Sequence, residues 1–162
     1  MIKILAATAA LAAVMTVSSA SATIQLLAKS YDMPNGGTGG GNDYLDSSYG
    51  GVGATGNPAA IGSSLAGGAG ELTDGVISAA HDWTGPYVGW LNINPTITFH
   101  FDGPPTITEI VFHFDDNDGG AGVGAPLSVE IDGGAAVPIA DPAGSDPFAF
   151  SVTGLRACPK SS

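Results

Sequence analysis

The sequence predicts an all-β fold, and three observations support this prediction. Apolar and polar residues alternate through several short runs, as they do in strands that bury one face. Turn-forming residues (Gly, Pro, Asp and Asn) separate these runs at intervals of roughly 10 to 16 residues. No amphipathic helix of useful length follows residue 22. This spacing is typical of an antiparallel sandwich or barrel.

Two strands are predicted at residues 96–101 and 109–114, where every second side chain is apolar. The Asp-Gly-Pro-Pro segment at 102–105 predicts a turn between them. The side chains expected on the inward faces of these two strands are Ile97, Phe99, Phe101, Ile110, Phe112 and Phe114.

Shorter strands are predicted on both sides of this pair. Apolar residues alternate through 127–131, and the Asp-Gly-Gly segment that follows is a strong hairpin signal. Weaker strand patterns occupy residues 24–28 and 88–91. The apolar residues expected to point inward after the hairpin turn are Val137 and Ile139, and then Phe148, Phe150 and Val152.

Residues 36–75 differ sharply from the rest, because they contain 14 of the 25 glycines, mixed with Ser, Asn, Thr and Asp. Such a composition predicts a long N-terminal loop region, or a set of loops, that buries no core of its own.

Residues 1–22 have the three parts of a secretory signal peptide. Lys3 gives a short positive start, residues 4–17 form an apolar run, and Ala20-Ser21-Ala22 offers small residues for cleavage before Thr23. A buried N-terminal helix is the alternative. The signal predicts a secreted, periplasmic or envelope-associated protein, with no transmembrane segment after cleavage.

Charge and cysteine content exclude several classes of function. Four Lys and Arg stand against 15 Asp and Glu, and a net charge of −11 cannot neutralise nucleic-acid phosphates. One cysteine cannot build a disulfide framework or a Cys-based zinc site. That residue, Cys158, would be an unpaired thiol in an oxidising compartment. It lies in a tail, residues 156–162, that shows no alternation and is expected to be irregular.

A resemblance sharpens these expectations. The Leu-Thr-Asp-Gly element at 72–75, the Gly-Trp pair at 89–90 and the alternating strand at 97–102 occur in the order found in one family. They resemble the discoidin-type, galactose-binding-like jelly-roll domain of secreted bacterial envelope proteins. The resemblance implies a jelly-roll β-sandwich over residues 23–155 that binds ligands without catalysis. It also implies a domain that lacks its last two strands, and a structural calcium near Asp74.

Asp43, Asp46 and Asp74 are the candidate calcium ligands. All three lie in glycine-rich surroundings, where loop carbonyls that no sheet uses can complete the oxygen shell of Ca²⁺. The alternative for Asp74 is a turn, in which an Asp before Gly bonds its own backbone. The acidic cluster at 115–120 follows a strand without EF-hand spacing, which favours a solvated hairpin loop over a metal site.

His81, Trp83 and Tyr87 are the candidate ligand-binding residues. The aromatic rings suit stacking on a sugar face, and His81 offers a hydrogen bond, so a glycan or envelope polysaccharide is the expected partner. Ordinary exposed aromatics are the alternative. Trp90 lies in an apolar run and is expected in the core.

No catalytic pattern stands out. His81 and Asp82 are neighbours, which would point to opposite faces of a strand, and no Gly-x-Ser-x-Gly elbow is present. The sequence therefore predicts an exported, non-catalytic binding or structural module of the bacterial envelope or extracellular matrix, stabilised by calcium and binding carbohydrate. The alternatives are a secreted carbohydrate-active hydrolase with cryptic carboxylates and a truncated fragment without function.

Overall fold

A computed structural model describes residues 25–37, 44–55, 60–81, 86–103, 105–120 and 123–155. In these ranges the chain forms short strands in small antiparallel sheets and no α-helix, which confirms the all-β prediction. The jelly-roll arrangement stays a prediction. The expected signal peptide, the tail at 156–162 with Cys158, and the candidate residues Asp43 and Trp83 lie outside the described residues.

The first sheet has the strand order β2-β1-β3. Its central strand, β1 (Ser30–Pro34), pairs with β2 (Ser64–Gly68) on one side and with β3 (Thr98–His100) on the other, both antiparallel. The β1–β2 register shifts between Tyr31 and Met33. The sheet thus joins three segments that lie about 30 residues apart in the sequence.

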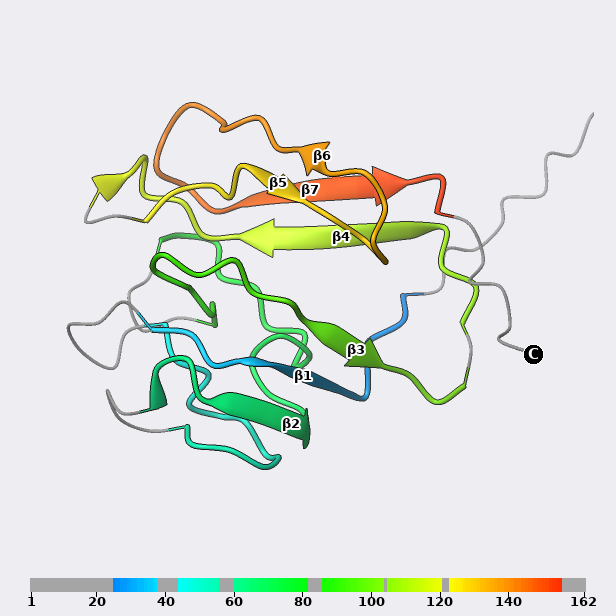
Figure 1. The fold of residues 1–162 in the computed structure, drawn as a ribbon. Helices are drawn as coiled ribbons and strands as arrows, with labels where there is room; N and C mark the ends of the chain where they lie inside the picture. The colour runs from blue at the N-terminus through cyan, green and yellow to red at the C-terminus, as the bar shows by residue number, and fades with distance from the viewer. Residues whose placement is uncertain are drawn as a thin grey trace, which may run out of the picture.

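Two further pairs form the other layer in Figure 1. β4 (Glu109–Phe114) pairs with β7 (Phe148–Thr153) along its whole length, and β5 (Ser128–Val129) pairs with β6 (Val137–Pro138). The turn predicted inside the β5–β6 hairpin is confirmed. Its residues Asp132 and Gly133 have φ angles of 51° and 69°, and Gly134 N donates to Ile131 O at 2.9 Å.

The main core lies against β1 and β2. It consists of Tyr31, Met33, Tyr49 and Leu65, and Tyr31 and Tyr49 meet edge to face with ring centroids 5.1 Å apart. The partly buried side chains that pack against this cluster are Leu72, Val88, Trp90 and Ile97.

The prediction for residues 36–75 was wrong in one respect, because this glycine-rich region supplies much of the core. It contains β2, and glycine lets its segments approach closely. A Cβ on Gly68 would overlap the backbone of Gly51, so these two segments pack only because both residues are Gly. The buried hydrophobic residues from this region are Tyr44, Leu45, Tyr49, Ala60 and Leu65.

Several predicted strands are shorter or absent. Residues 25–28 form no strand, and residues 88–91 contribute one bridge, from Trp90 to Gly37. Trp90 packs against the core, as expected, and its Nε1 donates to Pro34 O at 2.8 Å. Leu127 was expected to point inward but is 88% exposed, and the strand predicted at 127–131 is reduced to the two residues of β5.

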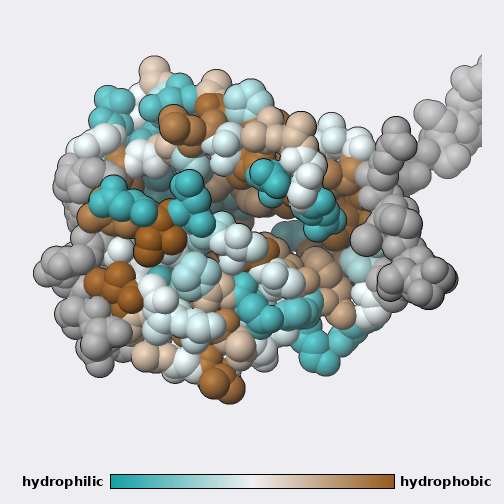
Figure 2. Space-filling model, viewed as in Figure 1, coloured by the Kyte–Doolittle hydropathy of each residue, from teal (hydrophilic) through white to brown (hydrophobic). Residues whose placement is uncertain are grey.

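A second apolar group lies on β4 and β7. The rings of Phe112 and Phe114 stack with centroids 5.9 Å apart, and Phe148 lies 5.6 Å from Phe114. These rings are half-buried. Figure 2 shows the molecule hollowed between this layer and the β1–β2–β3 layer.

Candidate functional site

Asp46 is fully buried in the loop after residue 43, and hydrogen bonds hold its carboxylate in place. Oδ2 accepts from the Tyr31 hydroxyl, and Oδ1 accepts from Ser48 Oγ and from the Glu71 amide, each at 3.3 Å. The Asp46 amide donates to Asn35 Oδ1 at 2.9 Å. These bonds offset the cost of burying the carboxylate and join three distant segments at one point.

Glu71 brings a second carboxylate beside Asp46. The preceding Gly70 permits this approach, since a Cβ there would lie 2.6 Å from Asp46 Oδ1. Glu71 Oε1 accepts from Ser47 Oγ at 3.4 Å, while Oε2 is buried and has no hydrogen-bond partner among the described residues. Burial above all, with the charges of Asp46 and then Asp74, raises the pKa of Glu71 to about 7. Sequence reasoning missed Glu71, although it directly precedes the Leu-Thr-Asp-Gly element.

Asp74 lies at the exposed edge of this carboxylate cluster, which consists of Asp46, Glu71 and Asp74. Its Oδ1 accepts from the Val76 amide at 2.8 Å, and Gly75 has a φ of 76°. This is the turn that an Asp before Gly was expected to form as the alternative to a metal site. Asp74 is nevertheless close enough to contribute to the raised pKa of Glu71.

The carboxylate cluster fits a calcium ion in part. Within the described residues, no three His, Cys, Asp or Glu side chains converge as a protein metal site would require. The two carboxylates of Asp46 and Glu71, including the orphaned Glu71 Oε2, do fit, provided that backbone carbonyls complete the shell. Lys29, the one lysine or arginine in the described ranges, pairs with Asp102 at 2.8 Å instead. No lysine or arginine of that part of the chain therefore balances the cluster.

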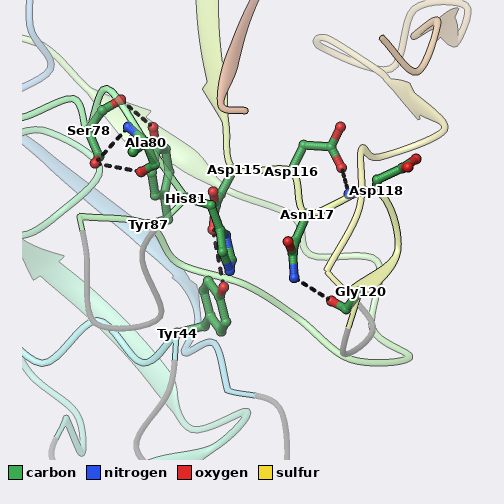
Figure 3. Close-up of polar contacts among 10 residues, drawn as sticks. All are labelled: Tyr44, Ser78, Ala80, His81, Tyr87, Asp115, Asp116, Asn117, Asp118 and Gly120. Atoms are coloured by element: carbon green, nitrogen blue, oxygen red, sulfur yellow. Dashed lines mark hydrogen bonds and ion pairs between the residues drawn. The ribbon is translucent and has the colours of Figure 1, made fainter. Parts of the chain in front are cut away.

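A second cluster, shown in Figure 3, forms around Asp115 at the end of β4. His81 Nδ1 lies 2.9 Å from Asp115 Oδ2, and the Tyr44 hydroxyl donates to the same oxygen at 3.1 Å. The side chains of His81 and Asp115 are 14% and 4% exposed. The sequence argued against the neighbour Asp82 as a partner of His81, and it could not identify Asp115, because no local pattern places the end of β4 beside this loop.

Tyr87 joins the same cluster from the other side. It is buried, and its hydroxyl donates to Ser78 O at 3.2 Å. Burial and then the charge of Asp115 raise the pKa of Tyr87. The structure thus brings two of the three predicted ligand-binding residues, His81 and Tyr87, to one place around Asp115. The ring of Tyr87 presents little surface there, since the residue is 8% exposed.

The acidic segment 115–120 differs from the solvated hairpin loop that was predicted. β4 pairs with the distant β7 and not with the next strand, and both Asp115 and Asp116 are buried. Asp116 Oδ1 accepts from the Asp118 amide at 2.9 Å. In Figure 3 the Asp115 carboxylate turns toward His81 and that of Asp116 turns toward the Asp118 amide, so the two do not converge.

Comparison with models of known families, with curated proteins and with solved structures finds no match for this chain. The described residues contain no helix that is long and apolar enough to cross a membrane. The candidate functions therefore rest on the chain's own residues.

Proposed function

We propose that the chain is an exported, non-catalytic binding module of the bacterial cell envelope or its extracellular matrix. Residues 23–155 form a discoidin-type β-sandwich in this proposal, and calcium stabilises it. The secretory pattern at 1–22, the all-β described chain and the acidic composition support the proposal. A glycan or envelope polysaccharide is the proposed partner.

The observation that carries the calcium proposal is the pair of neighbouring carboxylates Asp46 and Glu71, whose negative charge no lysine or arginine of the described residues balances. Burying two neighbouring carboxylates without a positive charge is unfavourable, as the raised pKa of Glu71 indicates. Calcium would supply the missing charge. Asp46, Glu71 and Asp74, with loop carbonyls, are the residues that would hold it, and they would then tie together the loops on either side of β2.

The glycan proposal rests on chemistry around residues 81–87. His81 and Asp115 offer polar groups, and Trp83 and Tyr87 are the aromatic residues of the predicted set. Stacking on an aromatic ring and hydrogen bonds to a few fixed polar groups are a common way to hold a small ligand. The net charge of −11 disfavours strongly anionic polymers as partners.

The calcium proposal is tested by thermal melts of the purified protein in calcium and in chelator. At a hundredfold excess over the Kd, calcium is expected to raise the free energy of unfolding by about 2.7 kcal/mol. Asp74→Ala and Glu71→Gln should lose most of this gain.

Asp102→Ala is the matched control, because Asp102 is also an exposed Asp before Gly but pairs with Lys29. It should keep the full calcium response, and magnesium at equal ionic strength should give a smaller one. A wild-type melt that calcium leaves unchanged contradicts the calcium proposal, and an undiminished response in Asp74→Ala removes Asp74 from it.

A further inference from the structure

The face of the β1–β2–β3 sheet that points away from the core carries a hollow of about 420 Å³. Tyr31, Met33 and Leu65 pack into the core, and Ile97 packs against it, so the alternate residues of these segments point to the opposite face. The residues of that outward face that line the hollow are Asp32, Pro34, Ser64, Ala66, Thr96 and Thr98.

The sequence of β2 explains why this face is hollow. The strand presents Ser64 and Ala66 outward, and Gly67 follows with a φ of 71° and open space where a Cβ would stand. These three small residues leave space above the strand that larger side chains would fill.

The hydroxyl groups at the hollow are available to a ligand. Ser64, Thr96 and Thr98 make no hydrogen bond through their side chains to other groups in the described part of the chain. Each hydroxyl can donate one hydrogen bond and accept two. Thr98 lies opposite Asp32 in the register, and Ser64 lies opposite Pro34, so the hydroxyls lie on both sides of β1.

Asp32 adds a fixed carboxylate at the centre of the sheet. Its Oδ1 accepts from the Gly67 amide at 2.7 Å, and its Oδ2 lies 2.9 Å from His100 Nε2. The Gly67 amide first, and then His100, lower the pKa of Asp32, so the group is ionised at neutral pH. Its side chain is 43% exposed, and each oxygen keeps a lone pair for an O–H group of a ligand.

We propose that this hollow binds a neutral saccharide, which deepens the glycan-binding function proposed above and rests on it. The hydroxyls of Ser64, Thr96 and Thr98 and the ionised carboxylate of Asp32 match the dense O–H groups of a sugar. Asp32 and the absence of Lys and Arg from the lining residues disfavour anionic sugars. The volume lies within the range of about 300–1,000 Å³ that is typical of small-molecule sites.

The test is NMR chemical-shift mapping on the purified protein, titrated with glucose, galactose, mannose and lactose as neutral probes and with alginate as an anionic one. Neutral sugars are expected to shift the amides of residues 32–33, 64–67 and 96–98. Thr98→Val removes one hydroxyl and keeps a β-branched strand residue, so it should fold and weaken binding about three- to tenfold. Thr153→Val on β7 is the matched control and should bind as the wild type does.

Each result decides between the hollow and the wider function. Shifts confined to the three named ranges, with weakened binding in Thr98→Val, support the hollow. Neutral-sugar shifts that map to residues 78–88 and are unaffected by Thr98→Val overturn the hollow but leave glycan binding in place. Binding of alginate without binding of any neutral sugar likewise overturns the hollow as a saccharide site but leaves glycan binding in place. Failure of every saccharide to bind overturns both proposals.

Discussion

At the scale of single residues, Glu71 shows how a position acquires its chemistry from the fold. Its pKa of about 7 arises from burial and from the charge of Asp46, whose carboxylate accepts a hydrogen bond from Tyr31 on the distant strand β1. The sequence pointed to Asp46 and Asp74 because they are acidic residues in glycine-rich surroundings. It could not point to Glu71, since nothing local shows that Gly70 lets this residue approach a buried carboxylate.

The raised pKa of Glu71 predicts a pH dependence of stability in chelator. The folded protein keeps the proton up to about pH 7, whereas the unfolded chain releases it near 4.5, so the unfolded chain binds fewer protons between these values. The free energy of unfolding should therefore fall as pH rises through this window, by about 1–2 kcal/mol once solvent screening of a half-buried group is allowed for.

The measurement is urea unfolding of wild type and Glu71→Gln at about pH 5 and about pH 8. Glu71→Gln removes the titrating group, so its loss of stability between the two pH values should be smaller than that of the wild type. Equal losses in the two proteins would show that Glu71 does not titrate in this window.

At the scale of elements, the sequence predicted the later strands better than the early ones. β4 and β7 follow their apolar alternation, and each pairs along its full length. β1 and β2 have the sequences SYDMP and SLAGG, whose Pro and Gly residues are poor strand formers. They form strands because Tyr31, Met33 and Leu65 bury their side chains together, which is a tertiary effect that no local pattern shows.

The β5–β6 turn gives a prediction at this scale. Gly133 has a φ of 69°, and a Cβ there would meet nothing within 4 Å, so Gly133→Ala should cost only backbone strain, about 1 kcal/mol of unfolding free energy. Gly124→Ala is the control, because Gly124 does not have a positive φ and its Cβ would make ordinary contacts from 3.7 Å. Chemical denaturation checks both variants. Equal effects would mean that the turn conformation is not what constrains Gly133.

At the scale of the whole molecule, two features stand out: a large excess of negative charge and a core that is divided between two layers. The net charge of −11 is concentrated on a chain of 162 residues, and most of its carboxylates have no cationic neighbour in the described ranges. The apolar side chains form two separate groups, one beside β1 and β2 and one on β4 and β7. A gap between the two layers is visible in Figure 2. The composition predicted the acidic surface, but the division of the core depends on strand order, which the sequence pattern does not specify.

Self-repulsion of this charge predicts that salt stabilises the fold. Raising NaCl from about 0.01 M to 0.15 M shortens the Debye length from about 30 Å to about 8 Å, which screens repulsion between exposed carboxylates. A gain of about 1 kcal/mol would raise the Tm by roughly 2–4 °C. Thermal melts across this range in chelator measure the effect. A Tm that falls with salt would show that attractive pairs such as Lys29–Asp102 outweigh the repulsion.

The strand order of the first sheet sets a sequence of events during folding. The β5–β6 hairpin joins residues fewer than 12 positions apart and closes on the microsecond scale, whereas β1 waits for β3, about 70 residues later. A chain that crosses a membrane as an unfolded thread, N-terminus first, would present β1 on the far side long before β3 follows. The sheet would then be completed only after most of the chain has emerged. Until that moment β1 has no β3 to pair with, so the first sheet cannot fold and block the passage of the chain.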